Sequence, residues 1–254
     1  MSRQHLLDRL LNVQTDTFEA LALDIFRYQA THNRVYADFL ALLKVNPLGV
    51  QQLADIPFLP IELFKSYAIQ SGQWRAERVF TSSGTTGSAT SRHLLRSELL
   101  YQVNARRAFE LQYGPLSTYT ILALLPAYLE RSRSSLVFMV DDFIRQTQDP
   151  DSGFFLYDQA ALLAAISRAR ARGRKILLLG VSFALLDLAE AHPGDYSGII
   201  VMETGGMKGR RKELTRNELH DILQEAFQLE TIHSEYGMTE LLSQAYSPGR
   251  GRFY

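Results

Sequence analysis

The feature that most constrains this fold is a repeated alternation of strand patterns and helical patterns from residue 97 onward. Apolar runs predict strands at 119–126, 154–157, 175–179 and 198–202, and amphipathic patterns predict helices at 97–113, 135–144, 158–171, 183–191 and 215–227. Such alternation is typical of βαβ units, which form a mainly parallel sheet. The strand cores at 121–125 and 176–179 are apolar throughout, as strands are when helices cover both faces of a sheet. The sequence therefore predicts an α/β fold with a mainly parallel sheet flanked by helices.

The first 50 residues predict a helical layer that precedes this sheet. A helical pattern covers residues 16–30, where Asp16 and Glu19 have the spacing of a capping pair. Asn33 is placed to cap the helix that follows. The search for internal repeats and low-complexity linkers finds none in the sequence. We therefore expect residues 1–254 to form one domain, with residues 1–50 as its helical layer.

The charge balance and the absence of cysteine exclude several classes of protein. Lysine and arginine together number 27, as do aspartate and glutamate, so the net charge is zero. This argues against a dedicated nucleic-acid or anionic-membrane binder, whose affinity depends on excess positive charge. With no cysteine, the chain has no disulfide, thiolate metal site or cysteine nucleophile. Because no signal-peptide pattern or membrane-length apolar run is present, we expect a cytoplasmic protein.

A loop rich in small and hydroxylated residues follows a short apolar segment at residues 79–88, which read VFTSSGTTGS. Gly84 and Gly87 allow positive φ angles and a close approach of the backbone to a ligand. The hydroxyl and backbone N–H groups of such a loop suit phosphate oxygens. It is not a Walker loop, because Ser88 follows the second glycine where that motif has lysine. The alternative interpretation is an ordinary solvent-exposed loop.

Two later loops, like the loop at 79–88, are expected to follow strands of the predicted parallel sheet, and they carry further polar groups. Residues 202–211 combine glycines with the cations Lys208, Arg210 and Arg211, and residues 233–240 form the other segment. Ligands of open parallel sheets bind beyond the carboxyl ends of the strands. Within the second segment Tyr236 is suited to stack on a base, and either Glu240 or Glu235 to hold a hard cation. Together with the loop at 79–88, these segments predict a nucleoside triphosphate site. Glu203 either reaches that site or pairs with a nearby arginine.

Two of these motifs resemble those of the adenylate-forming enzymes, the superfamily of acyl- and aryl-CoA ligases, luciferase-type ligases and adenylation domains. Residues 81–87 (TSSGTTG) resemble its phosphate loop, and residues 236–240 (YGMTE) resemble its downstream motif. More narrowly, the chain resembles the acyl-protein synthetase family through PFLPIELFK at 57–65, SGTTGSATSR at 83–92 and ETGGMKGR at 203–210. The resemblance extends from about residue 50 to the end, and phenylacetate-CoA ligases are a looser match.

The resemblance implies a large N-terminal α/β domain that catalyses an ATP-dependent, Mg²⁺-dependent reaction. A carboxylate, expected to be that of a fatty acid, would attack the α-phosphorus of ATP to give an acyl-adenylate and pyrophosphate. The acyl group would then pass to a thiol on a protein or on CoA, with a reductase or transferase as a further partner. The chain would thus be an acid–thiol ligase.

By match of motif, the resemblance also assigns roles to residues of this chain. Its candidate phosphate-binding residues are Thr81, Ser82, Ser83, Gly84, Thr85, Thr86 and Gly87, with Lys208 and Arg210 as neutralising cations. Thr204, Gly205 and Gly206 would line the adenine site, and Tyr236, followed by Gly237, would lie against the base. Thr239 would contact the α-phosphate, Glu240 would hold Mg²⁺, and Arg92 would take the place of a loop lysine that this chain lacks.

The chain departs from the family pattern at its C-terminal end. It ends 14 residues after Glu240, before the acidic residue, hinge and small C-terminal domain with which the family continues. We therefore expect a fragment of a longer enzyme, inactive by itself if that domain is required. One alternative is an aryl- or acyl-CoA ligase of the phenylacetate-CoA ligase type. Another is a non-catalytic nucleotide- or acyl-binding module that partners a separate enzyme.

Overall fold

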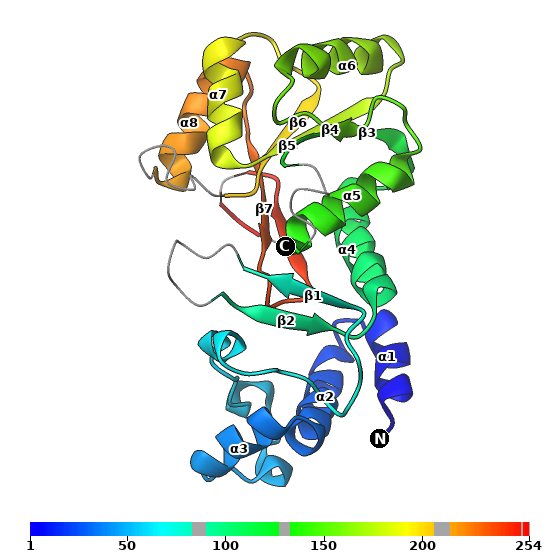
Figure 1. The fold of residues 1–254 in the computed structure, drawn as a ribbon, viewed down its shortest axis with the longest axis vertical. Helices are drawn as coiled ribbons and strands as arrows, with labels where there is room; N and C mark the ends of the chain where they lie inside the picture. Colours follow the sequence, from blue (N-terminus) through cyan, green and yellow to red (C-terminus); the bar gives the residue numbers. More distant parts are fainter. Residues whose placement is uncertain (83–89, 127–132, 206–213, 250, 254) are drawn as a thin grey trace. The chain divides into compact units, whose positions relative to one another are not determined.

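The computed structural model describes residues 1–82, 90–126, 133–205, 214–249 and 251–253 (Figure 1). The chain divides into two compact units. The first unit contains residues 1–79 and 83–96, and the second contains residues 80–82 and 97–254.

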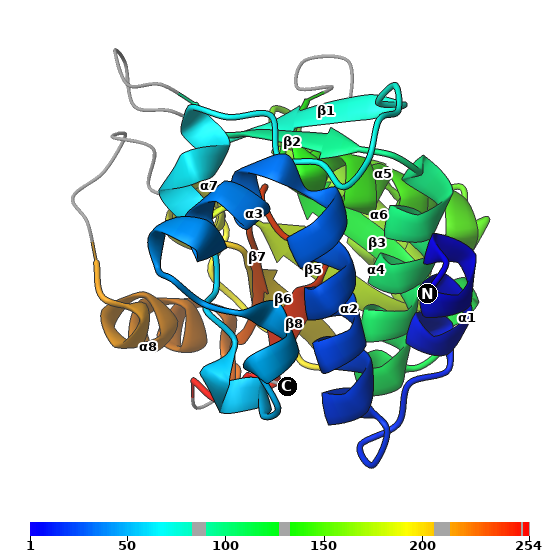
Figure 2. The ribbon, with the colours of Figure 1, turned by 90° about the horizontal axis from the view of Figure 1, so that it is seen from below.

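The first unit is built mainly from helices, as the sequence predicted for its N-terminal part. Its elements are α1 (Arg3–Leu11), α2 (Phe18–His32), α3 (Arg34–Leu42) and the 3₁₀ turns η1 (Pro47–Gly49), η2 (Leu53–Asp55) and η3 (Ile61–Lys65). Helices α2 and α3 lie side by side (Figure 2) and bury a cluster that includes Phe26, Tyr36 and Leu40. Burial of these apolar side chains is what stabilises so small a helical unit.

The helix caps of the first unit confirm one prediction and correct another. The Asn33 side chain accepts a hydrogen bond of 3.2 Å from the Tyr36 N–H, so Asn33 caps α3 as predicted. The predicted capping pair of Asp16 and Glu19 is wrong. The N-cap of α2 is residue 17, which makes no side-chain capping bond, and the Glu19 carboxylate instead accepts the N–H of Leu53 at 3.0 Å. Glu19 therefore bonds to a residue distant in the sequence and not to the start of its own helix.

Strands β1 (Arg78–Thr81) and β2 (Arg92–Leu95) form a two-stranded sheet. In the sequence, the residues between these two strands include most of the loop predicted at 79–88. Strand β1 confirms that a strand leads into this segment. However, β1 pairs with β2 and is not part of the six-stranded sheet. The expectation that this loop follows a strand of the main parallel sheet is therefore wrong. Strand β2 has only four residues, two polar followed by two apolar, so it gives no alternating pattern from which its pairing could be predicted.

The second unit contains a six-stranded sheet with the strand order β4-β3-β5-β6-β7-β8. The strands are β3 (Tyr119–Leu124), β4 (Gly153–Phe154), β5 (Lys175–Gly180), β6 (Ile199–Glu203), β7 (His233–Gly237) and β8 (Gln244–Ser247). All neighbouring pairs are parallel except β7 with β8. Every residue of β3 is buried, as the apolar run had indicated. The predicted α/β fold is confirmed.

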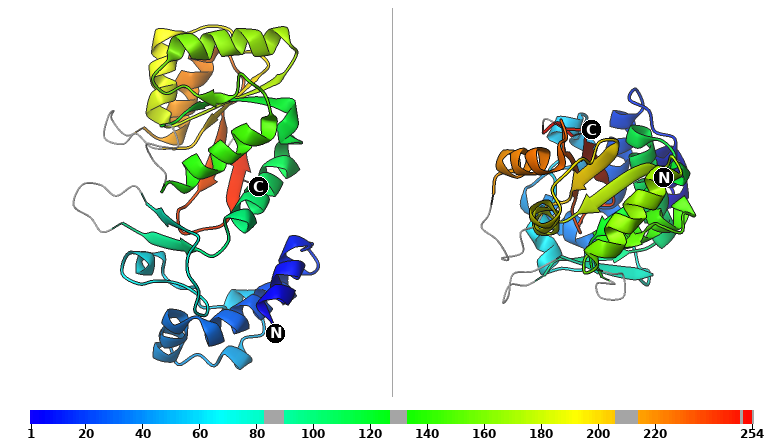
Figure 3. Two further views of the ribbon diagram at one scale, coloured as in Figure 1. Left: turned by 45° about the vertical axis from the view of Figure 1, so that its right-hand side comes forward. Right: turned by 90° about the horizontal axis from the view of Figure 1, so that it is seen from above.

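Five helices among the described residues of the second unit flank this sheet. They are α4 (Glu98–Tyr113), α5 (Ser135–Thr147), α6 (Gln159–Ala171), α7 (Ser182–Ala191) and α8 (Arg216–Phe227). Helix α5 packs against β3, α6 against β5, and α4 alongside β8 (Figure 3). Thr215 and Glu218 form the predicted capping box at the start of α8. None of the described helices is long and apolar enough to cross a lipid bilayer.

In the six-stranded sheet, β7 and β8 were not predicted as strands, and β4 is shorter than predicted. Residues 233–240 were expected to be a loop, but the first five of them form β7, which pairs with both β6 and β8. Strand β4 covers only two residues, 153–154, in place of the predicted 154–157. The polar sequence of β7 hides it from a hydrophobicity pattern, because its buried polar side chains find partners on other elements.

Candidate functional site

The candidate site lies at the carboxyl ends of the adjacent parallel strands β6 and β7 (Figure 1). The register pairs Met202 with His233 and Glu203 with Ser234. The turn that follows Glu203 therefore emerges at the same edge of the sheet as Tyr236 and the residues after it. Parallel pairing thus brings the second and third candidate segments together. The sequence placed each of them in a loop after a strand, whereas residues 233–237 are themselves strand β7.

The turn after β6 is held by hydrogen bonds to its neighbours in the sheet. The N–H of Thr204 donates to the carbonyl of Gly180 at 3.1 Å, and the carbonyl of Gly205 accepts from the N–H of Ser182 at 3.4 Å. Gly205 has a φ of +72°, a conformation that L side chains rarely adopt, and a Cβ atom there would meet no atom of the described residues within 4 Å. Hydrogen bonds therefore fix the backbone at Thr204 and Gly205, and no described residue crowds the position of a Gly205 Cβ atom.

The buried carboxylate of Glu203 also holds this turn through a hydrogen bond. One oxygen of Glu203, Oε2, accepts the N–H of Gly205 at 2.7 Å. The other oxygen, Oε1, lies 3.3 Å from Nε of Arg216 and 3.6 Å from Nε2 of His220. Only 3% of Glu203 is exposed to solvent, so its carboxylate acts within the fold. Of the two alternatives that the sequence left open, the structure shows the pairing with an arginine.

The surroundings of Glu203 keep it ionised. Burial raises the pKa of this carboxyl, but hydrogen bonds from His220, Ser234 and the N–H of Gly205, together with the Arg216 charge, lower it by more. The resulting pKa lies below its ordinary value. A negative charge therefore persists beneath the turn at neutral pH.

Tyr236 presents an aromatic ring at the end of β7. Its side chain is 47% exposed, and its hydroxyl donates to Sδ of Met238 at 3.0 Å. Gly237 follows it and pairs with Gln244 of β8. An aromatic ring with this exposure is available to stack on a planar base, which is the role predicted for Tyr236.

Thr239 and Glu240 lie in the connection between β7 and β8. Both residues are half-buried, in a turn closed by a hydrogen bond of 3.1 Å from the N–H of Leu241 to the carbonyl of Met238. No group of three or more metal-ligating side chains occurs within the described parts of the chain. A single carboxylate such as that of Glu240 would supply one ligand to Mg²⁺, an ion whose other ligands are commonly phosphate oxygens and water.

Glu235, the alternative cation ligand, is enclosed within the unit. Burial, and to a smaller extent the Glu203 charge, raises the pKa of Glu235 to about 8. A carboxyl that is protonated at neutral pH is a poor ligand for a hard cation. Of the two candidate glutamates, the geometry therefore favours Glu240 for a cation.

The other predicted site residues belong to the segment around β1 and β2 or lie outside the described residues. Thr81 and Ser82 are half-buried, and the N–H of Thr81 donates to the carbonyl of Arg133 at 3.0 Å. Arg92 is exposed at the start of β2, in the first unit. The residues outside the described part are Ser83, Gly84, Thr85, Thr86, Gly87, Gly206, Lys208 and Arg210. Their predicted roles stay predictions.

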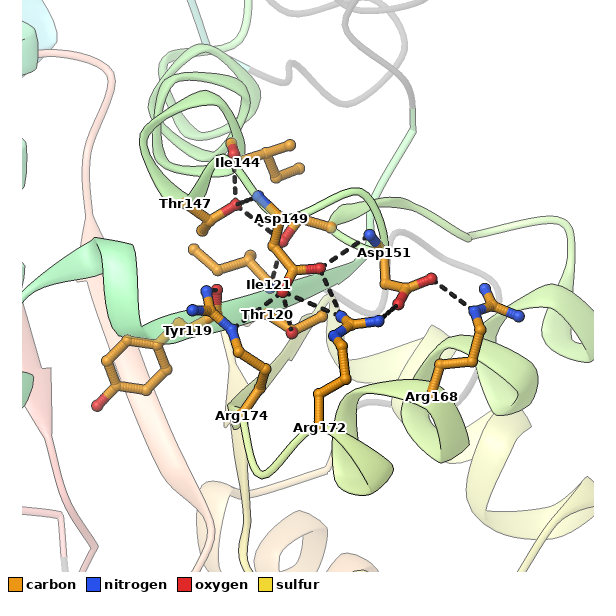
Figure 4. Close-up of polar contacts among 11 residues, drawn as sticks. Tyr119, Thr120, Ile121, Ile144, Thr147, Asp149, Asp151, Arg168, Arg172 and Arg174 are labelled. Carbon is orange, nitrogen blue, oxygen red and sulfur yellow. Dashed lines mark hydrogen bonds and ion pairs between the residues drawn. The ribbon is translucent and has the colours of Figure 1, made fainter.

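A second polar cluster joins the loop before β4 to the end of α6 (Figure 4). Asp149 accepts hydrogen bonds from Arg172 at 2.9 Å and from the Thr120 hydroxyl at 3.1 Å. Asp151 accepts from Nε of Arg168 at 2.7 Å and also pairs with Arg172. Because carboxylates neutralise these arginines, the cluster is a structural brace.

Sequence reasoning missed two residues that the structure brings to the candidate site, Arg216 and Phe253. Arg216 contacts both the Glu203 carboxylate and the Phe253 ring, and the Phe253 ring contacts Tyr236. No local pattern marks these residues, since their contacts join distant segments of the chain.

A scan against protein-family models found no matching model, and a search of curated proteins found no significant match.

Proposed function

We propose that this chain is the ATP-binding part of an acyl-adenylating ligase of the acyl-protein synthetase type. The observation that carries the proposal is the shared edge of β6 and β7, where the Thr204–Gly205 turn and the exposed Tyr236 ring meet. The motif resemblance of these segments to adenylate-forming enzymes, and the α/β fold, support the same conclusion. The cytoplasm, with its supply of ATP, is the proposed compartment.

The proposed reaction transfers an adenylyl group. A carboxylate oxygen of the acid attacks the α-phosphorus of ATP, and the bond from that phosphorus to the bridging oxygen breaks to release pyrophosphate. A thiol of a protein or of CoA then attacks the acyl carbon and displaces AMP. In the first step the protein positions the reactants and offsets the charge that develops around phosphorus.

Each candidate residue has a defined task in that step. Tyr236 lies against the adenine base, and the Thr204–Gly205 turn borders it. The Thr239 hydroxyl donates to the α-phosphate, and Glu240 is the carboxylate that holds Mg²⁺, the ion that offsets phosphate charge when bound. The substrate carboxylate is already a nucleophile, so the reaction requires no nucleophilic side chain from this chain.

Isotope exchange between ATP and pyrophosphate tests this proposal. The full-length protein that contains this chain is assayed with a panel of fatty, aryl and short-chain acids, and exchange that depends on the acid is the expected result. Glu240→Ala should reduce exchange at least about tenfold, because one metal ligand is lost. Glu225→Ala, at an exposed position on α8, is the matched control and should leave exchange unchanged.

The outcomes separate the three candidate functions. Fatty-acid-dependent exchange supports the acyl-protein synthetase type, whereas exchange with aryl acids alone favours a CoA ligase of the phenylacetate type. A protein that binds ATP but shows no exchange with any acid would be a binding module, and the proposed activity would be rejected. Full activity in Glu240→Ala would overturn the metal assignment.

A further inference from the structure

We propose that Phe253 and Tyr236 form two aromatic walls of the site for the purine base, and that Arg216 is the positioning residue for Phe253. This inference rests on the proposed function and extends it to a residue that carries none of the motifs above. All contacts on which it depends lie within the second unit.

The two rings meet at a steep angle. Their centroids are 6.1 Å apart and their planes are inclined by 68°, which is an edge-to-face contact. Beside Phe253, the residue Tyr236 keeps 47% of its surface exposed to solvent. Two rings in this arrangement make an L-shaped apolar corner. A planar base that stacks on one ring therefore meets the other along its edge, so the corner fixes both the plane and the lateral position of the base.

Arg216 fixes the Phe253 ring from another side. Its guanidinium carbon lies 4.9 Å from the centroid of that ring, within the range of a cation–π contact. Nε of the same guanidinium lies 3.3 Å from Oε1 of Glu203, whose carboxylate is buried. The guanidinium is therefore held between a fixed negative charge and an aromatic face, and the position of Phe253 follows from that of Glu203.

The same carboxylate connects this aromatic corner to the glycine turn. Oε2 of Glu203 accepts the N–H of Gly205 at 2.7 Å while Oε1 faces Arg216. Glu203 thus ties three separate segments together: the turn after β6, the start of α8 through Arg216, and through Arg216 the Phe253 ring. These segments border the candidate base site, and one buried charge organises them.

The chemistry of the corner selects the kind of ligand. Aromatic rings and a glycine backbone offer stacking surfaces to a planar, electron-delocalised group, and every nucleobase has such a face. A phosphate chain gains nothing from these two rings. The corner therefore recognises the base of the nucleotide and leaves the binding of the phosphates to other parts of the protein.

Calorimetric titration of the purified chain with ATP and with inorganic tripolyphosphate tests the inference. Phe253→Leu removes the aromatic face but keeps an apolar side chain of similar size. It should weaken ATP binding about tenfold or more, because stacking on an aromatic side chain contributes strongly to the binding of a base. Binding of tripolyphosphate, which has no base, should be unchanged. Phe253→Tyr retains the ring and should keep affinity for ATP within about twofold of the parent.

Arg216→Met tests the positioning role. Phe18→Leu, at an exposed position on α2, is the matched control for Phe253→Leu. Arg216→Met should weaken ATP binding but not tripolyphosphate binding, and should add little to the effect of Phe253→Leu in the double variant. The control should bind both ligands as the parent does.

The results distinguish this inference from the proposed function. If the parent binds ATP and Phe253→Leu binds it equally well, the inference is wrong and the proposed function is untouched. An equal loss of ATP and tripolyphosphate affinity in the variant would also reject the inference, because the effect would not be specific to the base. A parent chain that binds neither ligand would contradict the proposed function itself, and the inference with it.

Discussion

A Cβ atom at position 237 would lie 2.7 Å from Oε1 of Glu235, so Gly237 leaves just enough room for the carboxyl group of its neighbour. Glu235 is buried and pairs across the strands with Tyr246, whose ring is also buried. The Glu235 carboxyl lies near Tyr101 and the Glu203 charge as well. A buried carboxyl in such surroundings favours its neutral form.

This relationship predicts that the stability of the second unit falls as the pH rises. The pKa of Glu235 is about 8 in the folded protein, against an ordinary value of 4.5. Between these values the folded state holds a proton that the unfolded state has lost, so the contribution of Glu235 to stability is fully present below about pH 4.5 and is lost as pH rises through 8. Since one pH unit between the two pKa values corresponds to about 1.4 kcal/mol, this group lowers stability by a few kcal/mol between pH 5 and 8.

Glu235→Gln tests this prediction, because the amide has nearly the same shape and never ionises. Urea unfolding at pH 5, 6.5 and 8 should show a smaller decline for the variant than for the parent, and the variant should gain stability relative to the parent as pH rises. Glu225→Gln, on the exposed surface of α8, is the control and should follow the parent. If the variant declines as steeply as the parent, Glu235 is not the group responsible.

The aspartate–arginine cluster predicts the opposite dependence at acid pH. Hydrogen bonds from Arg172 and Arg168 hold the pKa of Asp151 below its ordinary value of 3.8. This group therefore contributes stability above about pH 4, and the contribution disappears as pH falls through the lower folded value. Asp151→Asn should lower the thermal midpoint at pH 7 by several degrees, and the difference from the parent should shrink toward pH 3.

Asp221→Asn, at an exposed position on α8, is the matched control for this prediction. It should leave the midpoint unchanged at both pH values. A difference between Asp151→Asn and the parent that stays constant from pH 7 to pH 3 would show that the carboxylate charge is not what stabilises the brace (Figure 4).

Local signals in the sequence were enough to predict much of the second unit. The apolar run of β5 could be placed because a strand covered on both faces has no polar residue to interrupt it. The capping box of Thr215 and Glu218 located the start of α8, since both of its hydrogen bonds join residues three positions apart. The position of Gly205 after the predicted strand β6 placed it at the edge of the sheet where ligands bind, whereas Tyr236 lies in β7, which the sequence did not predict.

The remaining features depend on partners that are distant in the chain. Glu19 bonds to Leu53 and not to its own helix end, and strand β7 is polar because Ser234 and Glu235 find buried surroundings on other elements. The contact of Arg216 with Phe253 has no spacing rule at all. Such residues can be identified only after the fold has brought their segments together.

The last prediction concerns Gly205, where a substitution tests backbone strain without a steric clash with any described residue. Its φ is +72°, and a Cβ atom there would meet nothing within 4 Å, so Gly205→Ala should cost about 1 kcal/mol from backbone strain alone. Gly205→Asn should cost less, since asparagine tolerates positive φ better than alanine does. Gly49→Ala is the control, because Gly49 has equally open surroundings without a positive φ, and urea unfolding should show no loss there. Equal stability of Gly205→Ala and the parent would mean that the turn relaxes when substituted, and that the Glu203 carboxylate does not hold it in this conformation.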